Sequence, residues 1–319
     1  MNQLNEELSN QQATEVQVGS RKRRSVRGVI KDSLTGYMFM GPAIFILSVF
    51  ILAPILYALF LSFNDVELLG GISYQFEALD NYTRVVDDSR AKIALWNTFE
   101  YVIIVVPVQT FLALLLASAL NSKIKGRNFF RLIFFLPTVT SSAVLTLIFM
   151  WMYKQDGLIN TFLGVFSLPA IDWLNNPEVA LKSIMIMNIW ATAPFFMVIY
   201  LAAMQDIPKD LYEAATIDGA NWWQKFFRIT VPMLKPITFF VVVMGVIGTF
   251  QLFDQSYIFS GGSGGPNNST LTVVLLIYQY AFDLLDMGYA SALAIMLAII
   301  IMVVTIIQRK FFGEEKMYS

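Results

Sequence analysis

The side chains that could do chemistry in this chain are hydroxyls and amides that interrupt long apolar runs. These groups donate and accept hydrogen bonds without carrying charge, so they match an uncharged, hydroxyl-rich ligand such as a sugar. The candidates lie in three apolar segments and are Thr138, Thr140, Ser141, Ser142, Asn188, Thr192, Thr249, Gln251, Asp254 and Gln255. Aromatic rings that could stack on a sugar accompany them at Trp190, Phe195, Phe250 and Phe253. The alternative for each polar residue is a hydrogen bond between helices, which is common in membranes.

Other chemistry is excluded by composition. The chain has no Cys and no His, so we expect no disulfide, no Ser-His-Asp triad, no catalytic residue and no metal site. It also lacks the phosphate-binding pattern Gly-x-x-x-x-Gly-Lys-Ser/Thr, so ATP or any other cofactor is not expected to bind to this chain itself. Glu100 and Asp254 are the acidic residues within or at the edge of the apolar segments, and both lie near outer ends, which disfavours a proton relay. The net charge of −1 gives no attraction for nucleic acid.

The stretch 205–236 is a polar island between two apolar segments. It predicts two short helices with a sharp corner, because Gly219 suits the left-handed residue that follows a helix. Asp206 is the expected N-cap of the first helix. An Asn and a Gln three residues apart, at 221–224, form a capping-box pattern for the second helix, and Pro232 is expected to end it.

The first of these short helices has an unusual surface. Its acids are Asp210, Glu213 and Asp218, and its middle carries Ala214 and Ala215. The helix is too polar to lie in a membrane and its side chains are too small to build a core. A partner protein could therefore approach its backbone closely.

The elements that must position these residues are membrane helices. The chain has 319 residues, of which 56% are hydrophobic and 14% charged, whereas soluble domains have about 25% charged residues. Six apolar segments are each near the roughly 20 residues that cross a bilayer, at 37–63, 95–120, 129–152, 183–204, 237–259 and 288–307. We predict an all-α integral membrane protein with six transmembrane helices. Residues 1–33 are expected to be a disordered, basic cytoplasmic tail, and 34–319 the transmembrane domain.

Basic residues predict the orientation. With the N-terminus inside, the inner segments hold 17 of the 22 Lys and Arg residues. Cytoplasmic loops carry such an excess, so both termini are expected in the cytoplasm. The stretch 205–236 then lies there too.

The polar island also carries a family resemblance. Glu213-Ala214-Ala215, then Asp218-Gly219-Ala220, then Ile229 and Pro232, resemble the signature loop of permease subunits of binding-protein-dependent ABC importers. Val231 stands where that family usually has Leu, which keeps an apolar contact. The resemblance implies the transmembrane fold of type I ABC importers. It also implies a coupling helix that docks into an ATPase subunit, with the coupling residues Glu213, Ala214, Ala215, Asp218, Gly219 and Ala220.

Within the family, the chain resembles the carbohydrate branch, of the maltose and glycerol-phosphate type, over about 35–312. Asn188-Ile189-Trp190 is the best match to the ligand contacts of that branch. The resemblance implies a substrate path that includes Thr138, Ser142, Asn188, Thr192, Gln251 and Asp254. It further implies a bacterial cell membrane and a substrate that is a sugar, in particular an oligosaccharide. The apolar segments lack the cationic clusters that a phosphate ligand needs, which favours a neutral sugar over a glycerol phosphate diester.

The partners implied are a second, similar permease, two cytosolic ATPases that bind the ATP, an extracellular solute-binding protein and membrane lipid. Three other classes remain open. A secondary carrier or channel for a small polar solute would use an ion gradient. A membrane-embedded enzyme is disfavoured by the absence of His, Cys and paired carboxylates. The third class is a non-transporting anchor or receptor, and the helix corner at 213–219 distinguishes a transporter from it.

Overall fold

The computed structural model describes residues 26–67, 71–122 and 126–312, with side chains described between residues 37 and 310. The chain divides into two compact units, Met1–Tyr57 and Ala58–Ser319, which are taken in turn. Most of the tail expected at 1–33 lies outside the described residues. Residues 26–33 of that tail are described, and they form the beginning of the first helix.

The first unit is one long apolar helix. It contains α2 (Val26–Leu47) and the π-helical turn η1 (Ser48–Leu52), and α3 (Ala53–Leu61) carries the chain on into the second unit. In the wider π turn the Ala53 N–H bonds the carbonyl of Ser48, five residues back. Pro54 follows directly, so the wide turn falls where the missing N–H of a proline disturbs the regular pattern. The apolar stretch Tyr37–Leu61 is long enough to span a membrane.

The second unit contains the remaining membrane helices, which pack around α5 (Ser89–Asn121). They are α9 (Pro177–Gln205), α13 (Lys235–Phe250) with α14 (Asp254–Ser260), and α16 (Met287–Phe312). Over the described residues of both units, five helices are long and apolar enough to span a membrane. A sixth span exists if α6 (Arg127–Val139) and α7 (Ser142–Met152) form one broken crossing, since they are bent by 101°. The all-α, six-segment architecture is therefore confirmed, with its third segment broken.

The break in the third segment has a local cause. Thr138 and Thr140 donate their hydroxyls back to the carbonyls of Phe135 and Leu136. Thr140 and Ser141 are then in extended backbone conformations. Hydroxyl side chains that bond nearby backbone groups compete with helix continuation. The run of hydroxyls after Pro137 thus ends α6 and lets α7 start in a new direction.

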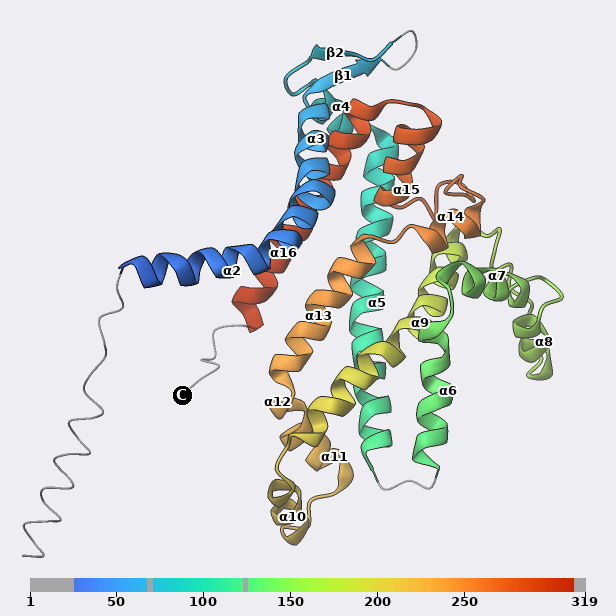
Figure 1. Cartoon of the computed structure of the whole chain (residues 1–319). Coiled ribbons are helices and arrows are strands. Elements are labelled where there is room, and N and C mark those ends of the chain that lie inside the picture. The colour runs from blue at the N-terminus through green and yellow to red at the C-terminus, as the bar shows by residue number, and fades with distance from the viewer. Residues whose placement is uncertain (1–25, 68–70, 123–125, 313–319) are drawn as a thin grey trace, which may run out of the picture. The chain divides into compact units, whose positions relative to one another are not determined.

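The shorter elements lie mostly at the two ends of the second unit. A hairpin of β1 (Asn64–Glu67) and β2 (Ser73–Phe76) was not expected from the all-α pattern. One end also carries α4 (Asp80–Asp87), α15 (Val273–Tyr278) and the π turn η3 (Gln279–Asp283), whereas α8 (Leu158–Val165) lies at the side of the unit, next to α7 (Figure 1). The other end carries α10 (Lys209–Ile217), α11 (Trp222–Lys225), the π turn η2 (Phe226–Thr230) and α12 (Val231–Met233), as Figure 1 shows.

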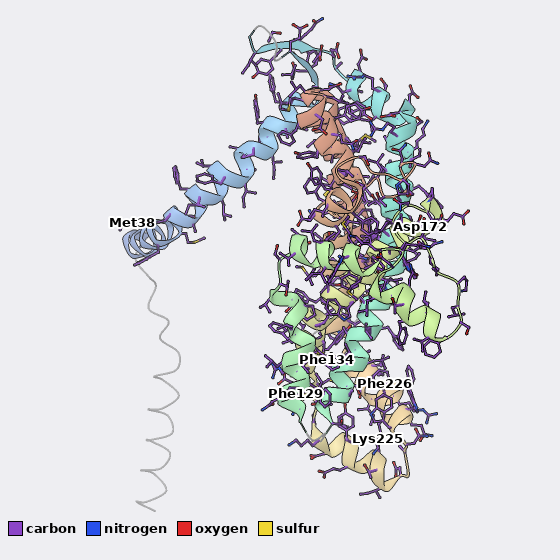
Figure 2. All side chains as sticks on the ribbon, turned by 90° about the vertical axis from the view of Figure 1, so that its right-hand side faces the viewer. Met38, Phe129, Phe134, Asp172, Lys225 and Phe226 are labelled. Carbon is purple, nitrogen blue, oxygen red and sulfur yellow. The ribbon has the colours of Figure 1, made fainter. Side chains whose placement is uncertain are left out.

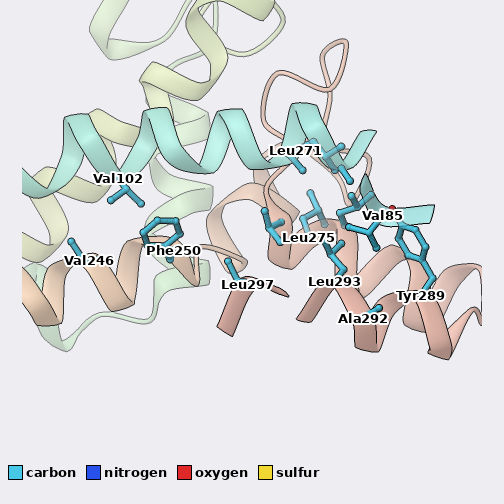
Figure 3. Close-up of a cluster of buried hydrophobic side chains, with 14 of the residues drawn as sticks. Val85, Val102, Val246, Phe250, Leu271, Leu275, Tyr289, Ala292, Leu293 and Leu297 are labelled. Atoms are coloured by element: carbon cyan, nitrogen blue, oxygen red, sulfur yellow. The ribbon is translucent and has the colours of Figure 1, made fainter. Parts of the chain in front are cut away.

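Three apolar clusters hold the second unit together. Figure 3 shows the first, where Val102 of α5 lies beside Val246 and Phe250 of α13, and Leu293 of α16 lies further along the cluster near Leu275. The second cluster joins the C-terminal halves of α5 and α9. There Ala113, Ala117 and Ala193 are fully buried, and such small side chains let two helices approach closely in a membrane. The third cluster packs α5, α7 and α9 near the opposite end.

Asp88, the N-cap of α5, connects α5 to η3 and α16 through hydrogen bonds. It accepts hydrogen bonds from the hydroxyls of Tyr289 and Tyr280, at 2.6 and 3.0 Å, and from the Arg90 N–H. Burial alone would raise the pKa of Asp88, but these hydrogen bonds outweigh it and hold the pKa below its ordinary value. Nearby, Arg84 forms a 2.6 Å ion pair with Asp286.

Candidate substrate cavity and coupling segment

A cavity of about 420 Å³ lies in the second unit, between α5, α6, α9 and the α13–α14 junction. Five of the predicted substrate-path residues line it, namely Thr138, Asn188, Thr192, Gln251 and Asp254. A smaller cavity of about 160 Å³ shares three of these residues and adds the sixth, Ser142. The structure therefore brings all six predicted residues together, although they come from three separate stretches of the chain. Whether they contact a substrate stays a prediction.

A break in the fifth apolar segment exposes Gln251 and Asp254. The sequence predicts one continuous helix over 237–259, but α13 ends at Phe250 and α14 starts at Asp254. The carbonyl of Leu252, in the break, accepts a 2.8 Å hydrogen bond from the hydroxyl of Thr272. The freed backbone is thus satisfied by a residue of the following loop, as irregular backbone in a membrane requires. Gln251 and Asp254 flank the break and are both exposed.

Three helices meet at Gln109, a residue that the sequence analysis did not single out. The hydroxyl of Thr192 lies 2.7 Å from Oε1 of Gln109 and 2.8 Å from the carbonyl of Asn188. On the other side, a Cβ added to Gly245 of α13 would lie 2.7 Å from Nε2 of Gln109. Gln109 therefore joins α5 to α9 and packs closely on α13. For Thr192, this bond supports the interhelical alternative.

Tyr101 of α5 is the second lining residue that was missed. Its side chain is fully buried, and its hydroxyl has no hydrogen-bond partner among the described residues. A signal for both residues was available, because Tyr101 and Gln109 are polar groups within an apolar run that contains Pro107. Polar residues in membrane segments are rare and are often functional. Thr249 and Gln255, from the wider set of candidates, also line the cavity.

The coupling segment has the corner that the sequence predicts. Gly219 has a φ of +78° directly after α10, which is the left-handed conformation. The capping box at the start of α11 is complete, with Asn221 Oδ1 accepting from Gln224 N–H at 2.9 Å and Gln224 Oε1 accepting from Asn221 N–H at 2.7 Å. Glu213, Ala214, Asp218 and Gly219 are exposed, whereas Ala215 and Ala220 are half-buried.

Two details of this segment differ from expectation. Asp206 is not the N-cap of α10, because α9 runs on to Gln205 and Asp206 is its helical C-cap, while Pro208 occupies the N-cap position of α10. Pro232 does not end the second helix either. The π turn η2 precedes it, with Val231 N–H bonding the carbonyl of Phe226, and α12 continues to Met233. A proline is tolerated in the first turn after such a shift.

Several contacts fix α10 to α11 and to the π turn η2, which packs on the membrane helices. The hydroxyls of Tyr212 and Thr230 are 2.9 Å apart, and Lys225 Nζ lies 2.7 Å from the Thr216 hydroxyl. Phe226 is buried in the cluster that joins α5 and α9. In contrast, Ile217 at the end of α10 is 87% exposed.

Among the described residues, no group of three or more acidic side chains could hold a metal ion. A membrane-spanning helical protein with a polar internal cavity fits the class of membrane transport subunits.

The family follows from comparison with known proteins. Residues 109–312 match the family described as binding-protein-dependent transport system inner membrane component. The lactose transport system permease protein LacF of Rhizobium radiobacter is 38% identical over 288 residues, which are 89% of this chain and 95% of the relative. The arabinooligosaccharides transport system permease protein AraP of Bacillus subtilis (strain 168) is 37% identical, over 88% of this chain and 89% of the relative. The chain therefore belongs to this family.

A solved structure has the same fold. A chain of a bacterial alginate ABC transporter, crystallised with an alginate pentasaccharide-bound periplasmic protein, gives a TM-score of 0.77 at 22% identity. The match covers 90% of this chain and 96% of that chain. Our protein is a multi-pass membrane permease subunit of a binding-protein-dependent ABC transporter. Such permeases work with a second permease, with ATPase subunits and with a solute-binding protein.

Proposed function

We propose that this permease forms half of the transmembrane path for an uncharged oligosaccharide that an extracellular binding protein delivers. The observation that carries the proposal is the lining of the 420 Å³ cavity, where amides, hydroxyls and aromatic rings lie among small and aliphatic side chains and no Lys or Arg occurs among the described residues. Asp254 is the one ionisable carboxylate in that lining. An anionic substrate would meet this carboxylate without a compensating cation, which is unfavourable in a low-dielectric site.

The chemistry of the lining suits a sugar. Asn188, Gln251 and Gln255 offer amides, which both donate and accept, and so match hydroxyl groups that do the same. The rings of Phe195 and Phe253 offer apolar faces beside them. The relatives named for lactose and arabinooligosaccharides transport neutral sugars, which supports this substrate class.

We further propose that Glu213, Ala214, Ala215, Asp218, Gly219 and Ala220 receive the motion of a partner ATPase, which alone binds and hydrolyses ATP. The exposed face of α10 and the 87% exposed Ile217 would form the contact. Motion of α10 would pass to α9 through the short 206–208 link, and toward α13 through Thr230 and Phe226. The excess of basic residues in the inner segments supports cytoplasmic N- and C-termini in a bacterial cell membrane.

The test is uptake by the complete transporter, with both permeases, the ATPases and the binding protein, in proteoliposomes. We expect ATP-dependent uptake of neutral di- to tetrasaccharides, at least tenfold faster than uptake of uronic acid oligomers of equal length. Binding of each sugar to the isolated binding protein is measured in parallel, so that selection by that protein is separated from selection by the path. Uptake driven by an ion gradient without ATP, or preference of the path for acidic sugars, would contradict the proposal.

A further inference from the structure

A third cavity lies between α6 and α9, nearer to the coupling segment. It has about 300 Å³ and is lined by Asn128, Arg131, Leu132 and Phe135 of α6 and by Val198 of α9. The four α6 residues are spaced i, i+3, i+4 and i+7, so they form one face of that helix. We call this cavity the inner slot. Figure 2 shows α6 descending, through Phe134 and Phe129, toward the end of the molecule that holds Lys225 and Phe226.

The inner slot continues the substrate cavity. Phe135 lines the slot and Thr138, one helical turn further along α6, lines the substrate cavity. On α9, Val198 lines the slot and Phe195, again one turn away, lines the cavity. From Arg131 to Thr138 the distance along the helix axis is about 10 Å, at 1.5 Å per residue. Both cavities therefore lie along one groove between α6 and α9.

Polar side chains of α6 lie on its slot side. Asn128 and Arg131 line the slot beside the exposed Leu132, whereas the opposite side carries only apolar residues, Phe129, Ile133 and Leu136, all large and exposed. A membrane helix with one polar and one apolar face presents the apolar face to lipid. Arg131 has no hydrogen-bond or ion-pair partner among the described residues. Its five N–H donors are thus available to a ligand in the slot.

We infer that the inner slot is the last station of the translocation path, where Arg131 and Asn128 bind the hydroxyl groups of a sugar that leaves the substrate cavity toward the coupling-segment side. This inference rests on the proposed function for the identity of the ligand. A guanidinium donates to hydroxyl oxygens as it does to other acceptors, so a neutral sugar is accommodated. The proposed path then runs from the substrate cavity, whose described lining has no Lys or Arg, to the inner slot, which is lined by Arg131.

The absence of Cys from the chain provides the test. Phe135→Cys places one thiol in the slot, and Ile133→Cys places a matched thiol on the opposite face of the same helix turn. The nucleotide-free complete transporter, in inside-out vesicles, is treated with two membrane-impermeant methanethiosulfonates, one carrying a sulfonate and one a trimethylammonium. We expect Phe135→Cys to react at least tenfold faster than Ile133→Cys. Val198→Cys repeats the measurement from the facing wall should Phe135→Cys fail to assemble.

The charge of Arg131 gives a second readout. Positions i and i+4 of a helix are about 6 Å apart, where one charge in water changes the local concentration of an ion about threefold. Replacing Arg131 by Leu in the Phe135→Cys transporter should therefore lower the sulfonate-to-trimethylammonium rate ratio about tenfold. Arg309→Leu, a control cation on α16, should leave the ratio unchanged.

Two results would overturn the inference. One is equal rates at Phe135→Cys and Ile133→Cys. The other is reaction of Phe135→Cys with a membrane-permeant maleimide but with neither charged reagent, as expected for a slot filled by a lipid chain. Failure of the proposed function is distinguishable, because the labelling pattern does not depend on which solute is carried. A transporter that imports no sugar but labels as expected would keep the slot as a path and lose only its carbohydrate ligand.

Discussion

The coupling segment and the substrate cavity are built in different ways. The coupling segment is one continuous stretch whose shape comes from local contacts, such as the capping box between Asn221 and Gln224 and the positive φ of Gly219. The substrate cavity draws its walls from α5, α6, α9 and the α13–α14 junction. A local structure can be disrupted at one residue, whereas a cavity shared by four helices distributes its function over many. A substitution at the corner of the coupling segment, Gly219, should therefore have a larger effect than any single substitution in the cavity.

The largest effect is expected for Gly219→Asp. Nothing lies within 4 Å of a Cβ added there, so the new side chain meets no clash within the chain. The cost comes instead mainly from a new charge beside Asp218 on the proposed contact face, because Asp, like Asn, occupies the left-handed backbone more readily than other non-glycine residues. We expect at least a tenfold loss of sugar uptake while the permease stays in the membrane, measured by transport and by co-purification of the ATPase.

Gly219→Asn is the matched variant for that experiment. Asn has the size of Asp, tolerates the left-handed conformation and carries no charge. It should keep more uptake than Gly219→Asp. Full transport with Gly219→Asp would remove the coupling role from this corner.

The next effect is expected for Asn188→Ala in the cavity. Loss of one ligand hydrogen bond costs about 0.5–1.5 kcal/mol, so the KM for sugar uptake should rise about two- to tenfold, with ATPase binding unchanged. Thr110→Val on α5 is the control, since the Thr110 hydroxyl is buried without a partner and does not line the cavity. If both variants show the same kinetics as the unaltered transporter, Asn188 has only a packing role.

The contrast between the two regions also explains what the sequence could predict. Gly219 and the 221–224 capping box were predictable because each depends on residues within a few positions. The long apolar segments were predictable because a bilayer requires a minimum length of apolar chain. The grouping of Thr138, Asn188 and Gln251 in one cavity agrees with the family resemblance, which supplies long-range information that composition does not.

Other features could not be predicted from the sequence. They depend on contacts between residues far apart in the chain, or on two local structures that the sequence favours equally. The break in the fifth segment needs the Thr272 hydroxyl on the Leu252 carbonyl, twenty residues away in the chain. Asp206 satisfied every local rule for an N-cap, but packing of α9 through Met204 and Ile207 extends that helix past the predicted boundary. The role of Gln109 is visible only once Thr192 and Gly245 are placed beside it.

Gly245→Ala should raise the KM for sugar uptake less than Asn188→Ala does. It tests whether residues from several helices act together in the cavity. Its Cβ would lie 2.7 Å from Gln109 Nε2, and since this atom ends a flexible side chain, Gln109 should move and weaken its bond to Thr192. We expect the KM to rise about two- to fivefold, as for the loss of one hydrogen bond. In a Gln109→Ala background, Gly245→Ala should add nothing, because the group it displaces is gone. Fully additive effects in this double-mutant cycle would show that Gly245 and Gln109 act separately.

The smallest effect is expected for Asn221→Ala, which removes the N-cap of α11 while leaving the exposed face of α10 intact. Loss of such a cap costs about 1 kcal/mol, which corresponds to about a fivefold rise in the locally open population. Proteolysis at 216–225 in the detergent-solubilised transporter should accelerate by that factor, whereas uptake should fall less than twofold. Asn221→Asp keeps a capping oxygen and should restore the original cleavage rate. A tenfold loss of uptake without faster cleavage would mean that Asn221 itself contacts the ATPase, which would extend the contact surface beyond α10.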